Sequence, residues 1–237
     1  MRCHNRKVYW RNDRNNCKLI LPMFLLTEKN IFPPVEMADR DGLLAIGGDL
    51  KTERLLLAYR KGIFPWFNEN EPIGWWSPDP RFVLFPDELK LSKSMKTVMN
   101  AGKFTFRHNT AFAEVIQNCK SINRKGQDGT WISADMQKAY TRLHELGYAH
   151  SAETWMNDKL VGGLYGIRLG KIFFGESMFS KIPNASKYAF INFISLLKKD
   201  KVQLIDCQVY TAHLESLGAR MIKRKQFVRL LNANIGK

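Results

Sequence analysis

The spacing of apolar residues changes along this chain, from a helical period to a strand-like one and back. Apolar positions three and four residues apart predict amphipathic helices, because this spacing puts them on one helical face. The segments with this spacing are residues 52–61, 92–101, 110–119 and 134–146. Runs of strand-forming residues predict strands instead. These runs are residues 82–85, 149–156, 159–168, 171–180 and 202–210. An apolar helix over 188–199, capped by Asn184 or Ser186, separates the last two strands.

This order of elements predicts an α+β fold with a mainly antiparallel, mixed sheet. The segments N-D-K and R-L-G-K suit tight turns, so the three strands between residues 149 and 180 should form a meander. The helix over 188–199 then crosses the sheet before the strand over 202–210. These elements predict one large domain over residues 81–237.

The residues before position 81 predict a smaller unit. Thr52 can cap a helix that Gly62 ends, and D-G-L-L-A-I-G-G-D-L before it predicts a glycine-rich turn. Three prolines within residues 72–80 predict an extended loop. We therefore expect a small aromatic-rich N-terminal domain, residues 23–80, packed on the larger domain. Residues 1–22 form a basic extension, which is either disordered or the product of a start codon assigned upstream of Met23.

Charge narrows the choice of partners. The chain has 37 Lys and Arg against 22 Asp and Glu, a formal net charge of +15, which predicts a polyanionic partner: RNA, DNA or a membrane surface. The alternative is an origin in a lineage whose proteins are generally basic. No apolar run approaches the roughly 18 residues that a membrane span needs, so we expect no membrane insertion. The four cysteines are scattered, without the spacing of a disulfide framework or a zinc site, which favours the reducing cytoplasm.

Polar side chains interrupt two of the apolar strands. Asp206 and Gln208 lie two residues apart in K-V-Q-L-I-D-C-Q-V-Y, so strand alternation puts them on one face. Glu176 lies in I-F-F-G-E-S-M-F-S. A carboxylate inside a strand is costly unless it is paired or lies in a cleft. These residues therefore either form a site or bond neighbouring backbone and Lys or Arg side chains for structural reasons.

Aromatic and basic residues cluster near the domain boundary, a combination that can stack bases and hold phosphates. The cluster comprises Tyr59, Arg60, Lys61, Phe64, Trp66, Trp75, Trp76 and Arg81. An aromatic core at the domain junction explains part of it equally well. The glycine-rich L-V-G-G-L-Y-G over 160–166 lies inside a strand-like run and does not open a helix, so it predicts a bulge or a close approach rather than a phosphate loop.

Eight short motifs occur together and in a fixed order. They are G-G-D-L (47–50), G-I-F-P-W (62–66), W-W-S-P-D-P-R (75–81), G-T-W-I (129–132), L-V-G-G-L-Y-G (160–166), G-E-S-M-F-S (175–180), N-A-S-K (184–187) and L-I-D-C-Q (204–208). With them the chain resembles the bacterial leucyl/phenylalanyl-tRNA–protein transferases from about Met23 to Phe227. The resemblance implies a GNAT-like acyltransferase fold for the larger domain.

The resemblance also implies a reaction. Such enzymes transfer Leu or Phe, and Met less efficiently, from aminoacyl-tRNA to the N-terminal Arg or Lys of a protein. The product carries an N-degron of the N-end rule pathway. Because the ester of aminoacyl-tRNA is already activated, the reaction needs proximity and a neutral amine rather than a cofactor or metal. We therefore expect aminoacyl-tRNA and acceptor proteins as partners, no cofactor, no metal, and a monomer in the cytoplasm.

Matching positions assign expected roles to individual residues. Asp206 and Gln208 are the expected catalytic pair, with Glu176 nearby. Asp206 would accept a hydrogen bond from the Gln208 amide and orient it, so that the Gln208 carbonyl aligns the attacking amine. Residues expected at the aminoacyl-adenosine site and in the Leu/Phe pocket are Trp66, Trp131, Tyr59, Phe173, Phe174, Met178 and Ile205. The family pattern has Asn at the position of Thr211, which puts the role of that position in question.

Two alternatives remain. A CoA-dependent N-acetyltransferase would share the fold, but M-F-S-K-I-P-N-A-S-K over 178–187 lacks the glycines that let backbone N–H groups cradle a pyrophosphate. A non-catalytic RNA-binding module would explain the charge and the aromatic residues. It leaves the polar positions in the strands unexplained.

Overall fold

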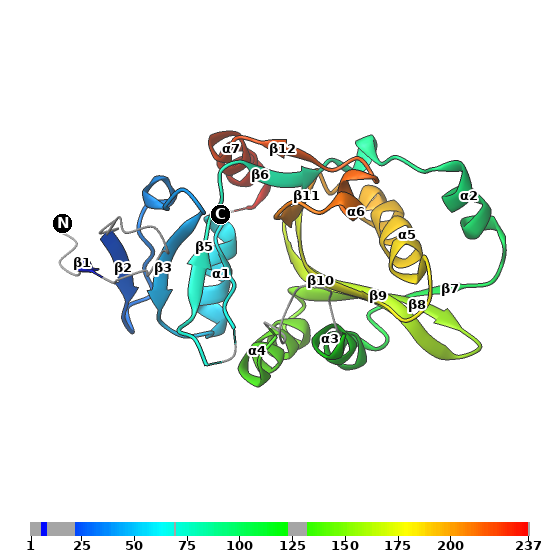
Figure 1. Cartoon of the computed structure of the whole chain (residues 1–237), viewed down its shortest axis with the longest axis horizontal. Helices are drawn as coiled ribbons and strands as arrows, with labels where there is room; N and C mark the ends of the chain where they lie inside the picture. The colour runs from blue at the N-terminus through cyan, green and yellow to red at the C-terminus, as the bar shows by residue number, and fades with distance from the viewer. Residues whose placement is uncertain (1–5, 9–21, 69, 123–131, 237) are drawn as a thin grey trace, which may run out of the picture.

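The computed structural model describes residues 6–8, 22–68, 70–122 and 132–236 (Figure 1). The chain folds into two parts, each built on its own sheet. Strands of the first part are β1 (Arg6–Val8), β2 (Pro22–Leu26), β3 (Leu43–Gly47), β4 (Phe64–Pro65) and β5 (Gly74–Trp76). They lie in the order β1-β2-β3-β5-β4, and α1 (Thr52–Arg60) connects β3 to β4. The predicted basic extension thus contributes β1, and its other residues before Pro22 lie outside the described part.

The second part is a seven-stranded sheet in the order β12-β6-β11-β10-β9-β8-β7. Its strands are β6 (Arg81–Leu84), β7 (Thr105–His108), β8 (Ala149–Met156), β9 (Lys159–Leu169), β10 (Ile172–Ser180), β11 (Leu204–Gln208) and β12 (Arg220–Ile222). Every neighbouring pair is antiparallel except β10 and β11, which are parallel. The predicted α+β fold with a mainly antiparallel, mixed sheet is confirmed.

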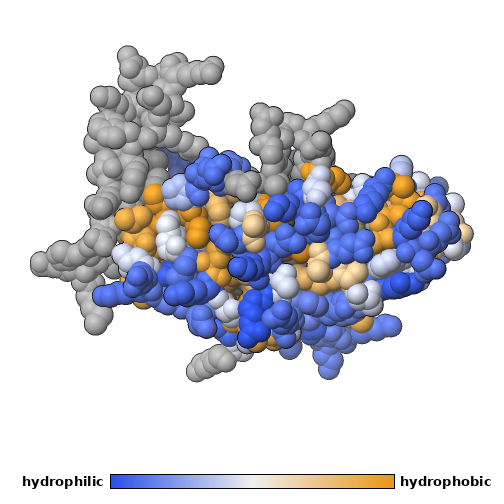
Figure 2. Space-filling model, turned by 90° about the horizontal axis from the view of Figure 1, so that it is seen from below, coloured by the Kyte–Doolittle hydropathy of each residue, from blue (hydrophilic) through white to orange (hydrophobic). Residues whose placement is uncertain are grey.

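Helices cover both faces of this sheet (Figure 1). The helices of the second part are α2 (Lys93–Asn100), α3 (Phe112–Ser121), α4 (Ala134–Glu145), α5 (Ala185–Lys199), α6 (Ala212–Glu215) and α7 (Arg224–Asn234). Helices α3 and α4 pack on one face and α5, the crossover between β10 and β11, on the other. Figure 2 shows the outer surface on the α3 and α4 side, where hydrophilic residues predominate and hydrophobic patches are smaller. Among the described helices, none combines the length and apolarity that a bilayer crossing requires.

Several predicted boundaries and caps were wrong. Residues 43–47, predicted as part of a glycine-rich turn, form the central strand β3, and Gly74–Trp76 within the predicted loop forms β5. Thr52 is the first residue of α1 instead of its cap, which is Lys51. Asn184 stands at the cap position of α5, but with a φ of 68° and no side-chain capping bond. The pairing of these segments with distant strands overrides their local preferences.

The two parts share one continuous apolar core. Residues of α1 and of the first sheet pack in the same cluster as α3, α4 and one face of the larger sheet. A second cluster fills the space between the other face and α5. Gly62 shows how closely the parts fit, since a Cβ there would lie 2.9 Å from the ring of Phe227 in α7. The first part therefore packs directly against the C-terminal helix.

Candidate active site

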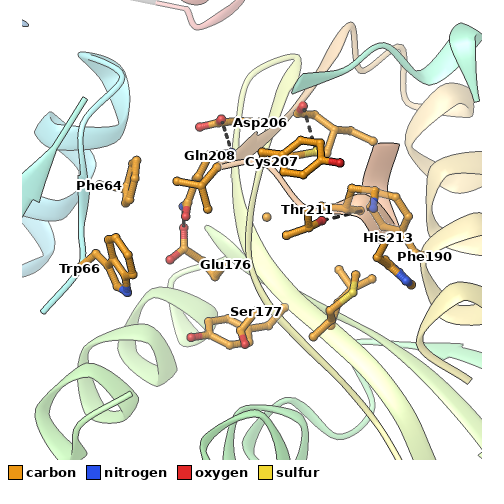
Figure 3. Close-up of a pocket in the computed structure, with 18 of the residues that line it drawn as sticks. Phe64, Trp66, Glu176, Ser177, Phe190, Asp206, Cys207, Gln208, Thr211 and His213 are labelled. Atoms are coloured by element: carbon orange, nitrogen blue, oxygen red, sulfur yellow. Dashed lines mark hydrogen bonds between the residues drawn. The ribbon is translucent and has the colours of Figure 1, made fainter. Parts of the chain in front are cut away.

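A cavity of about 490 Å³ opens where β10 and β11 separate (Figure 3). The two strands pair only from Ile172 opposite Leu204 to Phe174 opposite Asp206, although both continue further. Residues beyond the last pair line the cavity. Its walls are formed by Phe64, Pro65, Trp66, Leu164, Tyr165, Gly175, Glu176, Ser177, Met178, Phe190, Ile205, Asp206, Cys207, Gln208, Val209, Tyr210, Thr211, His213 and Leu214.

The cavity reaches both faces of the sheet. Leu164 and Tyr165 are neighbours on β9, so their side chains point to opposite faces, and both line the cavity. Figure 3 shows Phe64 and Trp66 on the side toward which Glu176 points, with Phe190 on the other side. The site thus has a polar side next to the first part of the chain and an apolar side next to α5.

Gln208 owes its direction to an irregularity in β11. Opposite β6, Asp206 pairs with Val83 and Gln208 with Phe82, so Cys207 is an extra residue in a β-bulge. Gln208 takes up the bend with a φ of 64°, a left-handed conformation that costs a non-glycine residue roughly 1–2 kcal/mol. Such strain needs compensation from the surroundings. At Gln208 the backbone N–H donates to Asp206 Oδ1 (2.9 Å), and the side-chain Nε2 donates to Glu176 Oε1 (2.9 Å).

Asp206 is completely buried and paired. Arg81 Nε donates to Asp206 Oδ1 (2.8 Å) and Arg81 Nη2 to Oδ2 (2.7 Å), a two-pronged ion pair in which Arg81 is only 1% exposed. The structure brings Asp206 and Gln208 together, as predicted, but through the bulge at Cys207 and not through regular strand alternation. The orienting bond differs from our expectation, however. Asp206 holds the backbone amide of Gln208, and Glu176 holds its side-chain amide.

Glu176 collects hydrogen bonds from three directions. Tyr59 donates to its Oε1 (2.8 Å), Tyr140 to its Oε2 (3.0 Å), and Gln208 to Oε1. The two tyrosine hydroxyls are also in hydrogen-bond contact with each other. Since each hydroxyl has one proton, this third bond forms only when Glu176 is protonated and donates to one of them. Burial raises the pKa of Glu176 to about 7, with a smaller contribution from the charge of Asp206, while the three donors oppose the rise. Burial and Glu176 in turn raise the pKa of both tyrosines well above the usual value.

The other predicted site residues fall into three groups. Trp66, 39% exposed, together with Met178 and Ile205, lines the cavity. Tyr59 is fully buried and contacts the site through Glu176. Phe173 and Phe174 are also fully buried but do not line the cavity: Phe173 packs edge-on against Phe193 and Phe174 against Tyr59, because both belong to the paired part of β10. Trp131 lies outside the described residues.

Thr211 has a structural role in this chain. Its hydroxyl accepts a hydrogen bond from the backbone N–H of Leu214 (3.2 Å) and caps α6. Asn ranks above Thr as an N-cap residue, so an Asn at this position could cap α6 as well.

The glycines of L-V-G-G-L-Y-G also serve packing. A Cβ at Gly162 would lie 2.5 Å from the Cβ of Ala185, and one at Gly166 would lie 2.2 Å from the carbonyl oxygen of Phe174. These close approaches are to α5 and β10.

Half of the aromatic and basic cluster is buried core, while Arg60, Lys61 and Trp66 are exposed. Trp75 and Tyr59 are fully buried. Arg81 is buried as well and pairs with Asp206, so it is not at the surface where it could bind RNA phosphates. Nothing in the sequence indicated that Tyr140 and Phe190 would belong to the site, and the pattern placed Phe64 and Arg81 only in the aromatic and basic cluster, without their contacts to the site residues. Arg81 carried a signal, because an arginine that opens an apolar strand needs a buried partner.

Comparison with known proteins decides the family. Residues 83–232 match the leucyl/phenylalanyl-tRNA protein transferase family, and residues 48–79 match the N-terminal domain of the same proteins. The chain belongs to this family. A leucyl/phenylalanyl-tRNA–protein transferase of Syntrophobacter fumaroxidans is 57% identical over 215 residues, 91% of this chain and 92% of the relative. One of Flavobacterium johnsoniae is 58% identical over 211 residues, 89% and 100% of the two chains.

A solved structure, the L-PGS of Bacillus licheniformis, has 12% identity and a TM-score of 0.38, covering 71% of this chain and 54% of that one. That similarity is too low to carry an argument.

The family membership makes the chain an aminoacyltransferase that uses aminoacyl-tRNA and protein as substrates. In the described part of the chain, no group of three His, Cys, Asp or Glu side chains could hold a metal ion.

Proposed function

We propose that this enzyme transfers Leu or Phe, and Met less efficiently, from aminoacyl-tRNA to the N-terminal Arg or Lys of acceptor proteins. The observation that carries the proposal is the Gln208 side chain, which Glu176 holds at the edge of a cavity with one apolar side. The protein would act as a monomer in the cytoplasm, where charged tRNA and N-terminal residues meet. Its products would enter the N-end rule degradation pathway.

The apolar side of the cavity suits the donor side chain. Leu164, Met178, Phe190 and Ile205 line it, and their neighbours in the α5 cluster are apolar as well. An unbranched methionine adapts to the shapes of both Leu and Phe, while a β-branched side chain would meet the wall close to its Cα. Trp66, on the opposite side, presents an exposed ring on which the terminal adenine can stack.

Gln208 and Glu176 can align and deprotonate the acceptor amine. With Nε2 bound to Glu176, the carbonyl oxygen of Gln208 is left to accept an N–H of the amine. The amine nitrogen attacks the ester carbonyl carbon, a C–N bond forms, and the C–O bond to the tRNA ribose breaks. The amine loses one proton in this step and the released ribose oxygen gains one, and Glu176, which itself lines the cavity, can carry the proton between them. A carboxyl with a pKa of about 7 can accept and release that proton at neutral pH.

Charge also favours the proposed acceptor. Among the residues that line the cavity, Glu176 and Asp206 carry carboxylates, and Arg81 neutralises that of Asp206. This differs from our expectation of a site lined with free carboxylates. Glu176 alone is left to attract a cationic N-terminal residue.

The test is a transfer assay with purified protein, Phe-tRNA and a peptide with N-terminal Arg, without ATP, with EDTA present. We expect a Phe-Arg-peptide, detected as a mass increase of one phenylalanine residue. The same peptide with N-terminal Ala is the control and should not react. Absence of product, with acetyl-CoA consumed in a parallel reaction instead, would refute the proposal in favour of an acetyltransferase.

A further inference from the structure

We propose that Arg81 is a positioning residue of the transfer reaction, which acts through Asp206 to set the direction of the Gln208 side chain. The inference rests on the proposed function and extends it to a residue outside the cavity. It assigns to the buried arginine a role in the rate of the chemical step, beyond its contribution to folding.

Arg81 and Gln208 share one atom of Asp206. The Oδ1 of Asp206 accepts from both the Nε of Arg81 (2.8 Å) and the backbone N–H of Gln208 (2.9 Å). The guanidinium fork thus fixes the plane of the carboxylate, and the carboxylate fixes the N–H at the bulge. Because Gln208 holds a φ of 64° there, loss of this bond would let the backbone relax and turn the side chain away from Glu176.

Two aromatic rings hold the guanidinium in place. Its Cζ lies 4.7 Å from the ring centre of Phe64 and 4.7 Å from that of Phe227. Phe64 belongs to the first part of the chain and lines the cavity, while Phe227 belongs to α7. Arg81 therefore ties both of these elements to the strand that carries Gln208. A lysine could supply the charge but neither the fork nor the stacking surface.

The chain offers a matched control in Arg220. Its guanidinium makes the same two-pronged contact, to Glu88 (2.8 and 3.0 Å), and stacks on Phe85 at 4.6 Å. This ion pair is half exposed, and neither partner lines the cavity. Arg220→Met removes an ion pair of the same geometry without touching Asp206.

The experiment compares Arg81→Met with Arg220→Met in steady-state and single-turnover transfer of Phe from Phe-tRNA to the Arg peptide. Misplacement of an aligning group by about 1 Å costs on the order of 100-fold in rate. We expect Arg81→Met to lower kcat by about 100-fold with a KM for Phe-tRNA within threefold of wild type. Arg81→Lys should lose about tenfold, and Arg220→Met should stay within twofold.

Two double variants separate positioning from folding, since Arg81→Met alone leaves a buried unpaired carboxylate. Arg81→Met with Asp206→Asn removes both charges and keeps an oxygen for the Gln208 N–H, but no guanidinium fork fixes the direction of that oxygen, so activity should recover only in part, to about tenfold below wild type. Arg81→Met with Asp206→Leu should melt like the first double variant yet remain about 100-fold slower. Equal rates in the two double variants, with an active wild type, would overturn the inference. An inactive wild type would instead refute the proposed function, and the inference with it.

Discussion

Replacing Glu176 by glutamine should stabilise the protein at alkaline pH and leave its stability nearly unchanged at acid pH. Burial raises the folded-state pKa of Glu176 from 4.5 to about 7. The protonated carboxyl therefore contributes stability that is fully present below pH 4.5 and is lost as the pH rises through 7. Glutamine is close in shape to the protonated carboxyl and does not titrate. The Glu176→Gln variant therefore keeps its stability as the pH rises, whereas the wild type loses stability when Glu176 deprotonates.

The size of the effect follows from the shift. One pKa unit corresponds to about 1.4 kcal/mol, so the rise to about 7 amounts to about 3 kcal/mol of unfolding free energy. The unfolding free energy of Glu176→Gln minus the unfolding free energy of the wild type should therefore rise between pH 5 and pH 8, by up to about 3 kcal/mol. Above pH 8 the difference should level off.

The measurement is urea unfolding of both proteins from pH 5 to pH 9, with the difference plotted against pH. Taking the difference cancels groups that titrate in both proteins, such as His150, whose pKa burial lowers to about 4. Glu153→Gln is the control, because hydrogen bonds from Thr110, Ser151 and the backbone outweigh burial and lower the pKa of Glu153. The unfolding free energy of Glu153→Gln minus that of the wild type should be negative, and it should not change with pH above pH 5.5. A flat difference for Glu176→Gln as well would refute the reasoning.

Three further predictions follow from packing and charge. Gly166→Ala should destabilise by about 3 kcal/mol, because its Cβ would meet the Phe174 carbonyl oxygen at 2.2 Å; an unchanged urea midpoint would contradict this. Phe190→Ala widens the apolar side of the cavity, so the ratio of Phe to Leu transfer rates should rise, and a constant ratio would place the donor side chain elsewhere. Binding of Phe-tRNA should weaken steeply with salt in a filter assay, since phosphate contacts release counterions; a flat response would exclude them.

Local signals in the sequence predicted five of the seven strands of the larger sheet, but the short edge strands β7 and β12 were missed, as were helices α6 and α7. Gly62 and Gly147 follow the ends of α1 and α4 with φ values of 74° and 80°, conformations that glycine adopts without strain. Strands β8, β9 and β10 begin and end within one residue of their predicted limits. Strand β3 was missed because a four-residue apolar run between two glycines has no period that distinguishes a strand from a turn.

The site was predictable only in part, for a related reason. Asp206, Gln208 and Glu176 stood out as polar residues in apolar strands. Their partners are distant in the chain: Arg81 lies 125 residues from Asp206, and Tyr59 lies 117 residues from Glu176. Nothing local marks such a pairing. The bulge at Cys207 was equally hidden, because no glycine accompanies it and Gln208 takes the left-handed conformation itself.

The packing of Arg81 between Phe64 and Phe227 has a consequence for folding during synthesis, because its partners leave the ribosome at different times. A ribosome releases the first part of the chain early, and N-terminal units generally fold first. Phe64 and Arg81 emerge long before Asp206, and the second ring arrives only with α7, near the end of the chain. A nascent or prematurely terminated chain therefore lacks the last component that holds the guanidinium. Competence to modify other proteins would thus be acquired only once α7 has been synthesised.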